Sequence, residues 1–234
     1  MKNLFSISII SFRLTDQNRV VEDAISSIQP ARTRVVLLPG CSFGTEADEN
    51  ESIRTLGQLA AHYGMYLFAE AGDYRLGRPD GSLYPITFGE LFSTSKEATP
   101  DKVRDLISKL STNRLLNIDN KMFALMICGE NNIIRNQQSL ENQPSVRHVG
   151  GQWPQPYDIL LNPAHTVMGN WGKLEKRFSL FSSQNRLALF CTNNTSHSSS
   201  WRSCLRFYRN GNLIQNGDTP TSRSNDWRVL TIQI

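Results

Sequence analysis

Short apolar runs that stop abruptly constrain the fold of this chain more than any other feature. The run over 33–40, TRVVLLPG, ends at a proline and is typical of a strand buried on both faces. Similar runs cover 121–128 and 157–164. An amphipathic stretch over 51–64 predicts a helix, with Ile53, Leu56, Leu59 and Ala60 on one face. Strands and helices therefore interleave through the first two thirds and strands dominate the end, which predicts a layered α/β protein.

Other segments extend this pattern. A first strand is predicted over 6–14, and a further strand over 65–75. A helix is predicted over 99–111 with Thr99 as its N-cap, and the Asn210-Gly211 pair predicts a hairpin. No internal repeat or linker interrupts the chain, so we expect one domain over 1–234.

Charge and cysteine spacing argue against some kinds of site but do not identify the function. The 234 residues carry 25 Lys plus Arg against 21 Asp plus Glu, a formal charge of +4. This mild excess is compatible with an anionic partner, including nucleic acid, but is also ordinary for a soluble enzyme. The four cysteines are scattered, with no CxxC pair and no histidine at ligand spacing. We therefore predict no metal site, no cofactor and no disulfide framework.

The sequence also carries a prediction of location. The segment MKNLFSISIISF is interrupted by serines and is interpreted as a strand and not as a secretory leader. The longest apolar runs fall well short of the roughly 20 residues that span a bilayer. The expectation is a cytoplasmic protein with reduced thiols and no membrane segment.

Cys128 is the candidate nucleophile. It closes an apolar run, and Gly129 and Glu130 follow at once. A strand end fixes the position of a thiol, and the turn after it offers N–H groups to an oxyanion. Gly129 is expected to permit positive φ and close approach by a substrate, and Glu130 to orient a neighbour or bind a polar substrate. The competing interpretation is that Cys128 is a small buried hydrophobe.

The order of motifs resembles that of the nitrilase, or carbon–nitrogen hydrolase, superfamily. The similar stretches are VVLLPG with SFGT, the helix end LAAHYG, the strand MYLFAEAG, LMICGENN, YDILLNPA and the closing FYRNGNLI…WRVLTIQI. This resemblance covers nearly the whole chain. It implies a four-layer α-β-β-α sandwich and hydrolysis of an amide by a Glu-Lys-Cys triad through a thioester.

Carried over position by position, the resemblance implies Cys128 as nucleophile and Lys96 as the lysine, although the usual sequence around that lysine is missing. Glu90, in TFGEL, is similar to a second glutamate that supports the lysine in some members. The main departure is Gly40, which stands where the family has the glutamate of its Pro-Glu motif.

Several residues are candidates to replace that base. Glu46, Glu49 and Glu70 lie in regions from which a carboxylate is able to reach the site. His165 follows the strand over 157–164, so we expect it on the same rim as Cys128, as a substrate contact, as a partner that forms the thiolate, or as a loop residue without a role in the site.

Two functions follow from these observations. The first is an active amidase that takes a small amide substrate, with His165 or a displaced acid as base. The second is a catalytically degenerate nitrilase-like subunit, favoured by Gly40 and by the missing lysine context. Members of the family commonly pair, which implies a homo-oligomer or a subunit of a larger bacterial complex, some of which handle nucleic acid.

Overall fold

The structure is a computed structural model of the 234-residue chain. It describes residues 5–13, 17–29, 32–43, 48–86, 92, 94–138, 144–148, 156–165, 171–194, 204–216 and 226–234.

Two six-stranded sheets dominate the part of the chain that the structure describes. In spatial order, the first sheet contains β14 (Trp227–Gln233), β1 (Ser6–Phe12), β2 (Val35–Leu37), β3 (Tyr66–Ala71), β4 (Asp73–Gly77) and β5 (Leu83–Pro85). The second contains β13 (Asn212–Asn216), β12 (Leu205–Arg209), β11 (Leu187–Thr192), β10 (Ile159–Ala164), β7 (Lys121–Leu125) and β6 (Leu115–Ile118). A separate two-stranded sheet pairs β8 (Ile134–Gln138) with β9 (Pro144–Val146).

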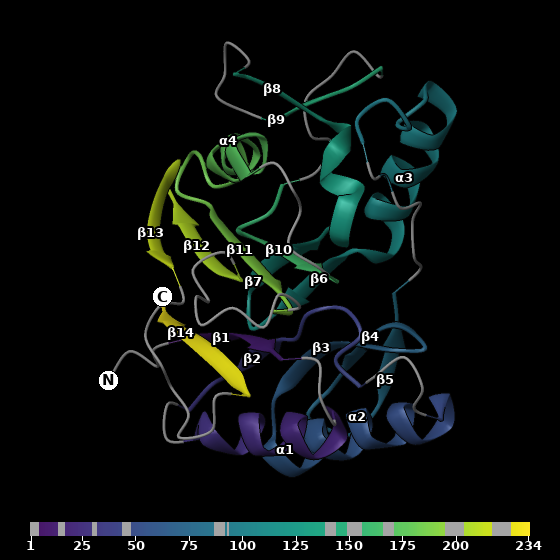
Figure 1. Cartoon of the computed structure of the whole chain (residues 1–234), viewed down its shortest axis with the longest axis vertical. Helices are drawn as coiled ribbons and strands as arrows, with labels where there is room; N and C mark the ends of the chain where they lie inside the picture. The colour runs from purple at the N-terminus through teal and green to yellow at the C-terminus, as the bar shows by residue number, and fades with distance from the viewer. Residues whose placement is uncertain are drawn as a thin grey trace.

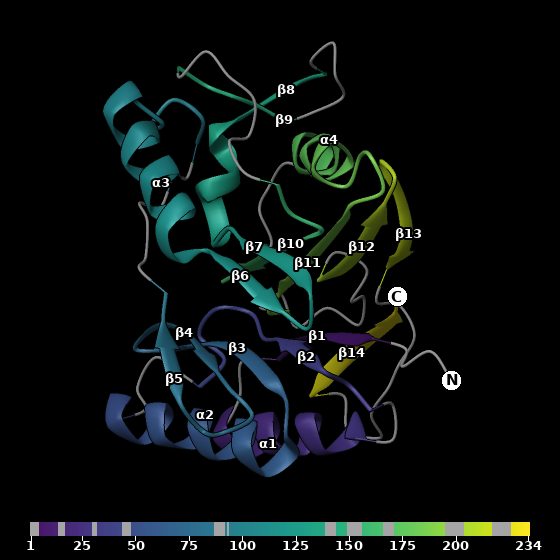
Figure 2. The same ribbon diagram turned by 180° about the vertical axis from the view of Figure 1, so that it is seen from behind.

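Helices cover the outer face of each sheet. Figures 1 and 2 show α1 (Gln17–Ser27) and α2 (Glu49–Tyr63) beneath the first sheet. On the far side of the second sheet lie α3 (Pro100–Asn113) and α4 (Trp171–Phe181). The result is the α-β-β-α sandwich that the sequence predicted.

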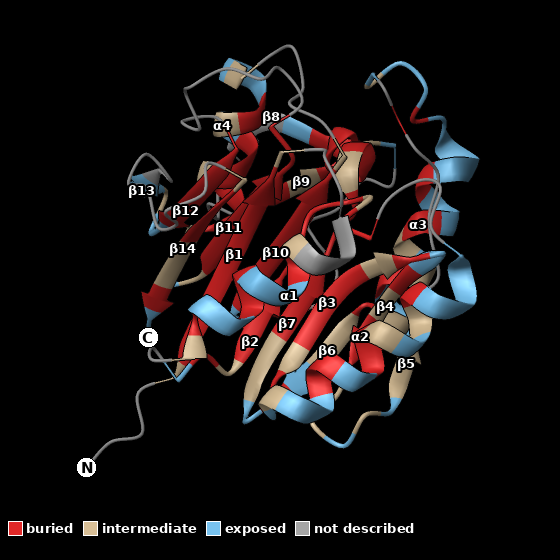
Figure 3. Cartoon of the chain, turned by 60° about the horizontal axis from the view of Figure 1, so that its bottom comes forward, coloured by how far each residue is buried: buried red, intermediate tan, exposed pale blue. Residues whose placement is uncertain are grey.

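Three apolar clusters fill the spaces between these layers. One lies between α1, α2 and the first sheet, another between the two sheets, and the third between the second sheet and α3 and α4. Alternate residues of one strand serve different clusters: in β10, Ile159 and Leu161 face the other sheet while Leu160 faces the helices. Figure 3 shows the buried strands between the partly exposed helices. Burial on both faces explains why these strands are near-continuous apolar runs.

Most of the expected elements are confirmed, with shifts at their ends. The helix α2 ends with Gly64 in the left-handed conformation, and α3 begins after Thr99 as N-cap. The strand predicted over 65–75 is instead two antiparallel strands, β3 and β4, because Gly72 makes a turn at φ +71°. Among the helices that the structure describes, none is both long and apolar enough to cross a membrane.

Candidate active site

The candidate site lies where parallel strands from both sheets end. Within the first sheet β1, β2 and β3 are parallel, and within the second β7, β10 and β11 are parallel. Gly40 and Cys41 follow β2, Glu70 lies near the end of β3, Cys128 follows β7 and His165 follows β10. Such carboxyl ends are the usual location of ligand sites in open α/β sheets.

Cys128 is held in a conformation that few residues adopt. β7 ends at Leu125, and a short 3-10 helix, η2 (Cys128–Ile133), begins at the cysteine itself. Its φ is +48°, a strained value for a residue with a side chain. The Cys128 carbonyl oxygen accepts hydrogen bonds from Asn131 Nδ2 at 3.0 Å and Asn162 Nδ2 at 3.4 Å. These two amides stabilise the turn that presents the thiol.

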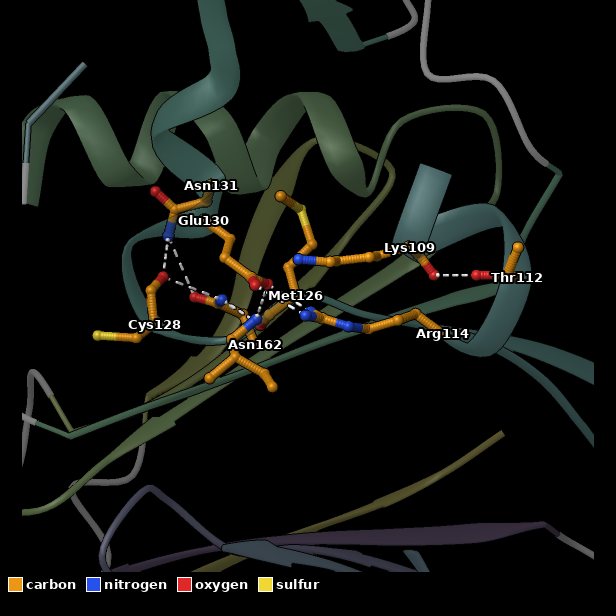
Figure 4. A network of polar contacts seen from close by, with 9 residues as sticks. Lys109, Thr112, Arg114, Met126, Cys128, Glu130, Asn131 and Asn162 are labelled. Carbon is orange, nitrogen blue, oxygen red and sulfur yellow. Dashed lines mark hydrogen bonds and ion pairs between the residues drawn. The ribbon is translucent and has the colours of Figure 1, made fainter. Parts of the chain in front are cut away.

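A buried ion pair supports this turn from behind. Arg114 donates to Glu130 through Nη2 and Oε1 at 2.8 Å and through Nη1 and Oε2 at 2.5 Å, and both side chains have no exposed area. Glu130 Oε2 also accepts the Ile127 N–H at 2.7 Å. Figure 4 shows the Cys128 thiol pointing away from this pair. Glu130 therefore orients the backbone before Cys128, and a contact between Glu130 and a substrate finds no support in this arrangement.

Glu70 approaches from the opposite sheet. On β3, Phe68 faces the space between the sheets and Ala69 faces the helices, so strand alternation directs Glu70 inward. Its Oε2 lies 2.8 Å from His165 Nε2 and accepts the Cys41 N–H at 2.7 Å. Burial disfavours the charged carboxylate, but the hydrogen bonds from His165 and from Cys41 outweigh burial and hold the pKa of Glu70 below its ordinary value.

His165 links that carboxylate to Cys128. Hydrogen bonds with the side chains of Cys128, Cys41 and Glu70 raise the pKa of His165 well above its ordinary value, against the opposing effect of burial. Burial also opposes a thiolate at Cys128, yet hydrogen bonds from the His165 side chain and from the backbone N–H groups of His165 and Gly129 lower the pKa of the thiol. The arrangement favours a thiolate–imidazolium pair backed by a carboxylate.

Gly40 leaves the space that this group of side chains fills. A Cβ at position 40 would lie 2.6 Å from His165 Cδ2, 2.8 Å from its Nε2 and 2.9 Å from Glu70 Oε2. Each distance is shorter than real Cβ contacts allow, so a side chain at Gly40 and the observed positions of His165 and Glu70 exclude one another. The glycine at position 40 and the contact between His165 and Glu70 therefore depend on each other: only a residue without a side chain at position 40 leaves room for that contact.

The other buried thiols differ from Cys128. Cys191 is fully buried, which raises the pKa of its thiol well above the ordinary value. Burial likewise raises the pKa of Cys204 to about 11. Both thiols pack inside the protein and are disfavoured as thiolates.

The remaining predicted residues fall in several environments. Lys96 is exposed in a turn before α3, where it has no polar contact with a described residue. Glu90 and Glu46 lie outside the described residues. Glu49, at the start of α2, is exposed and forms a long 3.7 Å ion pair with Arg75. Of the two candidate carboxylates that the structure describes, Glu49 and Glu70, Glu70 is the one that lies beside His165.

Gly129 corrects one detail of the sequence analysis. Its φ is not positive; the strained residue is Cys128 beside it. A Cβ at Gly129 would lie 2.1 Å from the Phe92 carbonyl oxygen, so the glycine is required by the close approach of the chain at Phe92. A contact between Gly129 and a substrate stays a prediction.

A group able to bind a metal was missed by the sequence analysis. One ligand atom each from Cys41, Glu70 and His165 lies within 4.8 Å of the others. These residues come from three separate strand ends, so no spacing pattern in the sequence links them. The expectation of no metal site was based on such spacing alone.

Comparisons with known proteins identify the fold. No protein-family model matches the chain, and no curated protein matches it significantly in sequence. A carbon–nitrogen hydrolase superfamily protein from Xanthomonas campestris, with an arsenic adduct in its active site, superposes with a TM-score of 0.59 at 11% identity. The match covers 99% of this chain and 91% of that protein.

Two further solved structures are similar. A variant of the amidase from Nesterenkonia sp. in complex with acrylamide gives a TM-score of 0.61 at 10% identity, covering 99% of this chain and 90% of that one. A carbon–nitrogen hydrolase from Helicobacter pylori gives 0.55 at 11% identity, covering 98% and 88%. The chain has the fold of the nitrilase, or carbon–nitrogen hydrolase, superfamily.

Proposed function

We propose that the protein hydrolyses the carbon–nitrogen bond of small amides, with Cys128 as nucleophile, His165 as acid and base, and Glu70 as the carboxylate that orients His165. The observation that carries this proposal is the Glu70–His165 contact of 2.8 Å in the space that Gly40 leaves open. A carboxylate, a proton carrier and a thiol are then all present, although none stands at the position of the family's glutamate or lysine.

The reaction follows from these contacts. The Cys128 thiolate attacks the amide carbon, and the tetrahedral intermediate collapses to a thioester as the imidazolium of His165 gives its proton to the departing amine. Neutral His165 then takes a proton from water, and the hydroxide oxygen attacks the thioester carbon. The carboxylic acid leaves, and the proton on His165 restores the thiolate–imidazolium pair. Glu70 stays ionised throughout and stabilises the charged ring.

Selective labelling of Cys128 tests the nucleophile. Iodoacetamide at neutral pH, followed by mass spectrometry of the four cysteine-containing peptides, should label Cys128 faster than Cys41, Cys191 or Cys204. Acrylamide is a second probe, since it adds to the active-site cysteine of a variant of the Nesterenkonia amidase. Labelling of Cys128 that is no faster than that of Cys41 would remove the basis of the proposal.

Hydrolysis itself is measured as ammonia release from a panel of short primary amides. Cys128→Ala should abolish release, and Gly40→Ala should slow it, because the added methyl group displaces the His165 ring. Cys204→Ala is a matched control for loss of a thiol away from the site. If Gly40→Ala keeps full activity, the space at Gly40 does not position His165, and the proposed triad is wrong.

The alternative of a degenerate binding or assembly subunit was favoured by Gly40 in place of the base and by the missing sequence context of the lysine. Glu70 and His165 supply a carboxylate and a proton carrier, which supports the enzyme over the inactive subunit. A role for Lys96 or Glu90 in catalysis stays a prediction, as do a homo-oligomer and a nucleic-acid partner.

A further inference from the structure

We propose that Cys41, Glu70 and His165 form a binding site for a thiophilic divalent cation of the Zn²⁺ class. One ligand atom of each residue lies within 4.8 Å of the other two. A tetrahedral ion with bonds of about 2.0–2.3 Å places its ligand atoms roughly 3.3–3.8 Å apart. The longest separation in the group therefore needs to shorten by up to about one ångström, while the 2.8 Å contact between Glu70 Oε2 and His165 Nε2 has to widen to admit an ion.

The donor set favours this class of ion. A thiolate, an imidazole nitrogen and a carboxylate oxygen are the three ligand types that Zn²⁺ takes in proteins. Ca²⁺ and Mg²⁺ prefer oxygen ligands, so Cys41 and His165 select against them. The thiolate and the carboxylate together balance the double positive charge, and the imidazole adds no charge.

Hydrogen bonds hold the backbone around Cys41 next to Glu70 and the second sheet. The Cys41 N–H donates to Glu70 Oε2 at 2.7 Å, and Cys41 has a φ of +56°. The Gly40 N–H donates to the Ala164 carbonyl at 3.1 Å, and Asn193 Nδ2 donates to the Gly40 carbonyl at 2.6 Å. These bonds join the loop after β2 to both sheets, which reduces the ordering needed when an ion binds.

The site is accessible and leaves one position open. Cys41 is partly exposed, and the side chains of His165 and Glu70 keep 25% and 22% of their surface exposed. Cys128 is not among the three residues of the group. An ion bound there has three protein ligands and a fourth position for water.

Binding of the ion has a consequence that rests on the proposed function. Coordination replaces the proton that His165 Nε2 shares with Glu70, so His165 loses the carboxylate that orients it. Zn²⁺ is then expected to inhibit hydrolysis reversibly. Metal binding itself is measured without substrate, so it stands or falls separately from hydrolysis.

Cobalt spectroscopy on the full-length protein tests the site. After treatment with a chelator and its removal, Co²⁺ should bind with one ion per chain and give a sulfur-to-cobalt charge-transfer band in the near ultraviolet. The band should disappear in Cys41→Ser and remain in Cys128→Ser, which serves as the matched control for the second thiol. Calorimetry with Zn²⁺ should show a larger loss of affinity in Cys41→Ser than the roughly 10- to 100-fold that is typical when only an outer-shell partner of a ligand is removed.

A second measurement distinguishes loss of the metal site from misfolding of the variant. Zn²⁺ should raise the melting temperature of the wild type, and Cys41→Ala, whose own melting temperature is recorded, should not gain from Zn²⁺. The proposal is overturned if the wild type fails to bind one ion, or if the cobalt band follows Cys128 in place of Cys41. A cobalt band that needs Cys41, together with an unreactive Cys128, would keep the metal site and reject the hydrolase.

Discussion

Two carboxylate–cation pairs flank Cys128, and they differ in almost every physical respect. The pair of Glu130 and Arg114 has no exposed side-chain surface and is bidentate. The pair of Glu70 and His165 has a single close contact of 2.8 Å and keeps about a quarter of each side chain exposed. Both pairs use a glutamate near a strand end, yet only the second contacts the thiol through its cation.

The difference shows that the two pairs have different roles: one fixes the position of Cys128, and the other changes its chemistry. A buried bidentate pair with arginine is locked in geometry, because arginine does not lose its proton and removal of one partner leaves a buried charge. A partly exposed pair with histidine exchanges protons with water and with the thiol. Glu130 therefore fixes where Cys128 stands, whereas Glu70 affects the charge state of Cys128 through His165.

The largest effect is expected from breaking the buried pair. Glu130→Leu removes the carboxylate that faces the fully buried Arg114 guanidinium, which should lower the free energy of unfolding by about 3–5 kcal/mol. Urea denaturation measures this loss, and the double variant Glu130→Leu/Arg114→Met should recover much of it. Equal loss in the single and double variants would show that Glu130 acts through packing and not through its charge.

His165→Asn breaks the second pair and should affect reactivity more than stability. Without the imidazolium, the pKa of Cys128 should rise, because less remains to offset the effect of burial, and labelling near neutral pH should slow roughly 10- to 100-fold. Iodoacetamide kinetics over a pH series, with chelator present, measure both the rate and the apparent pKa of Cys128. His62→Asn, on the exposed face of α2, is the control and should leave the profile unchanged.

Glu70→Gln gives a smaller effect whose pH dependence has a definite sign. The lowered pKa of Glu70 stabilises the fold above its unfolded pKa, and this contribution is lost as pH falls through the folded pKa. The raised pKa of His165 stabilises the fold below its unfolded pKa, and that contribution is lost as pH rises through the folded pKa. The stability difference between wild type and variant should peak between about pH 4.5 and 6.5, at no more than about 1 kcal/mol.

The free energies of unfolding of the wild type and of Glu70→Gln, measured across and above this pH range, test the sign of the pH dependence. Glu51→Gln, on the exposed side of α2, is the matched control. A difference between wild type and Glu70→Gln that grows steadily above pH 6.5, near the unfolded histidine pKa, would contradict this assignment.

The smallest effect is expected at Lys96. Because this side chain is exposed and lacks a polar contact with the described residues, Lys96→Ala should change Cys128 labelling by less than about twofold and stability by less than about 0.5 kcal/mol. Lys102→Ala on α3 is the control. A tenfold slower labelling of Cys128 in Lys96→Ala, but not in Lys102→Ala, would show that Lys96 acts at the site as the family's lysine does.

The sequence predicted the layers better than the chemistry. Apolar runs buried on both faces, such as β7 and β10, have a pattern that survives in a single sequence, and the order of motifs added the sandwich. It also placed Cys128 and His165 near one rim, because both follow parallel strands. The sequence named Glu70 only as one of three candidate carboxylates, because Glu70 belongs to the first sheet and reaches His165 only through tertiary packing.

Local backbone detail was also hidden in the sequence. The strain at Cys128 was expected at Gly129, because glycine is the residue that usually takes positive φ. The Phe92 carbonyl, distant in sequence, is what requires a glycine there. The partner of Glu130 was hidden for a similar reason: Arg114 lies at the end of α3, and the sequence gives no spacing rule that joins them.

The division of the site between two sheets has a consequence for folding. Glu70 comes from the first sheet, while Cys128 and His165 come from the second, and the first sheet is completed by β1 pairing with β14 from the other end of the sequence. Contacts between such distant segments are slow to form. Until the sheets dock, His165 lacks the contacts with Glu70 and Cys41 that help to keep it charged, so the Cys128 thiolate lacks part of its support. The increase in Cys128 reactivity that depends on Glu70, measured during refolding as the difference between wild type and Glu70→Gln, therefore reports the docking of one sheet on the other.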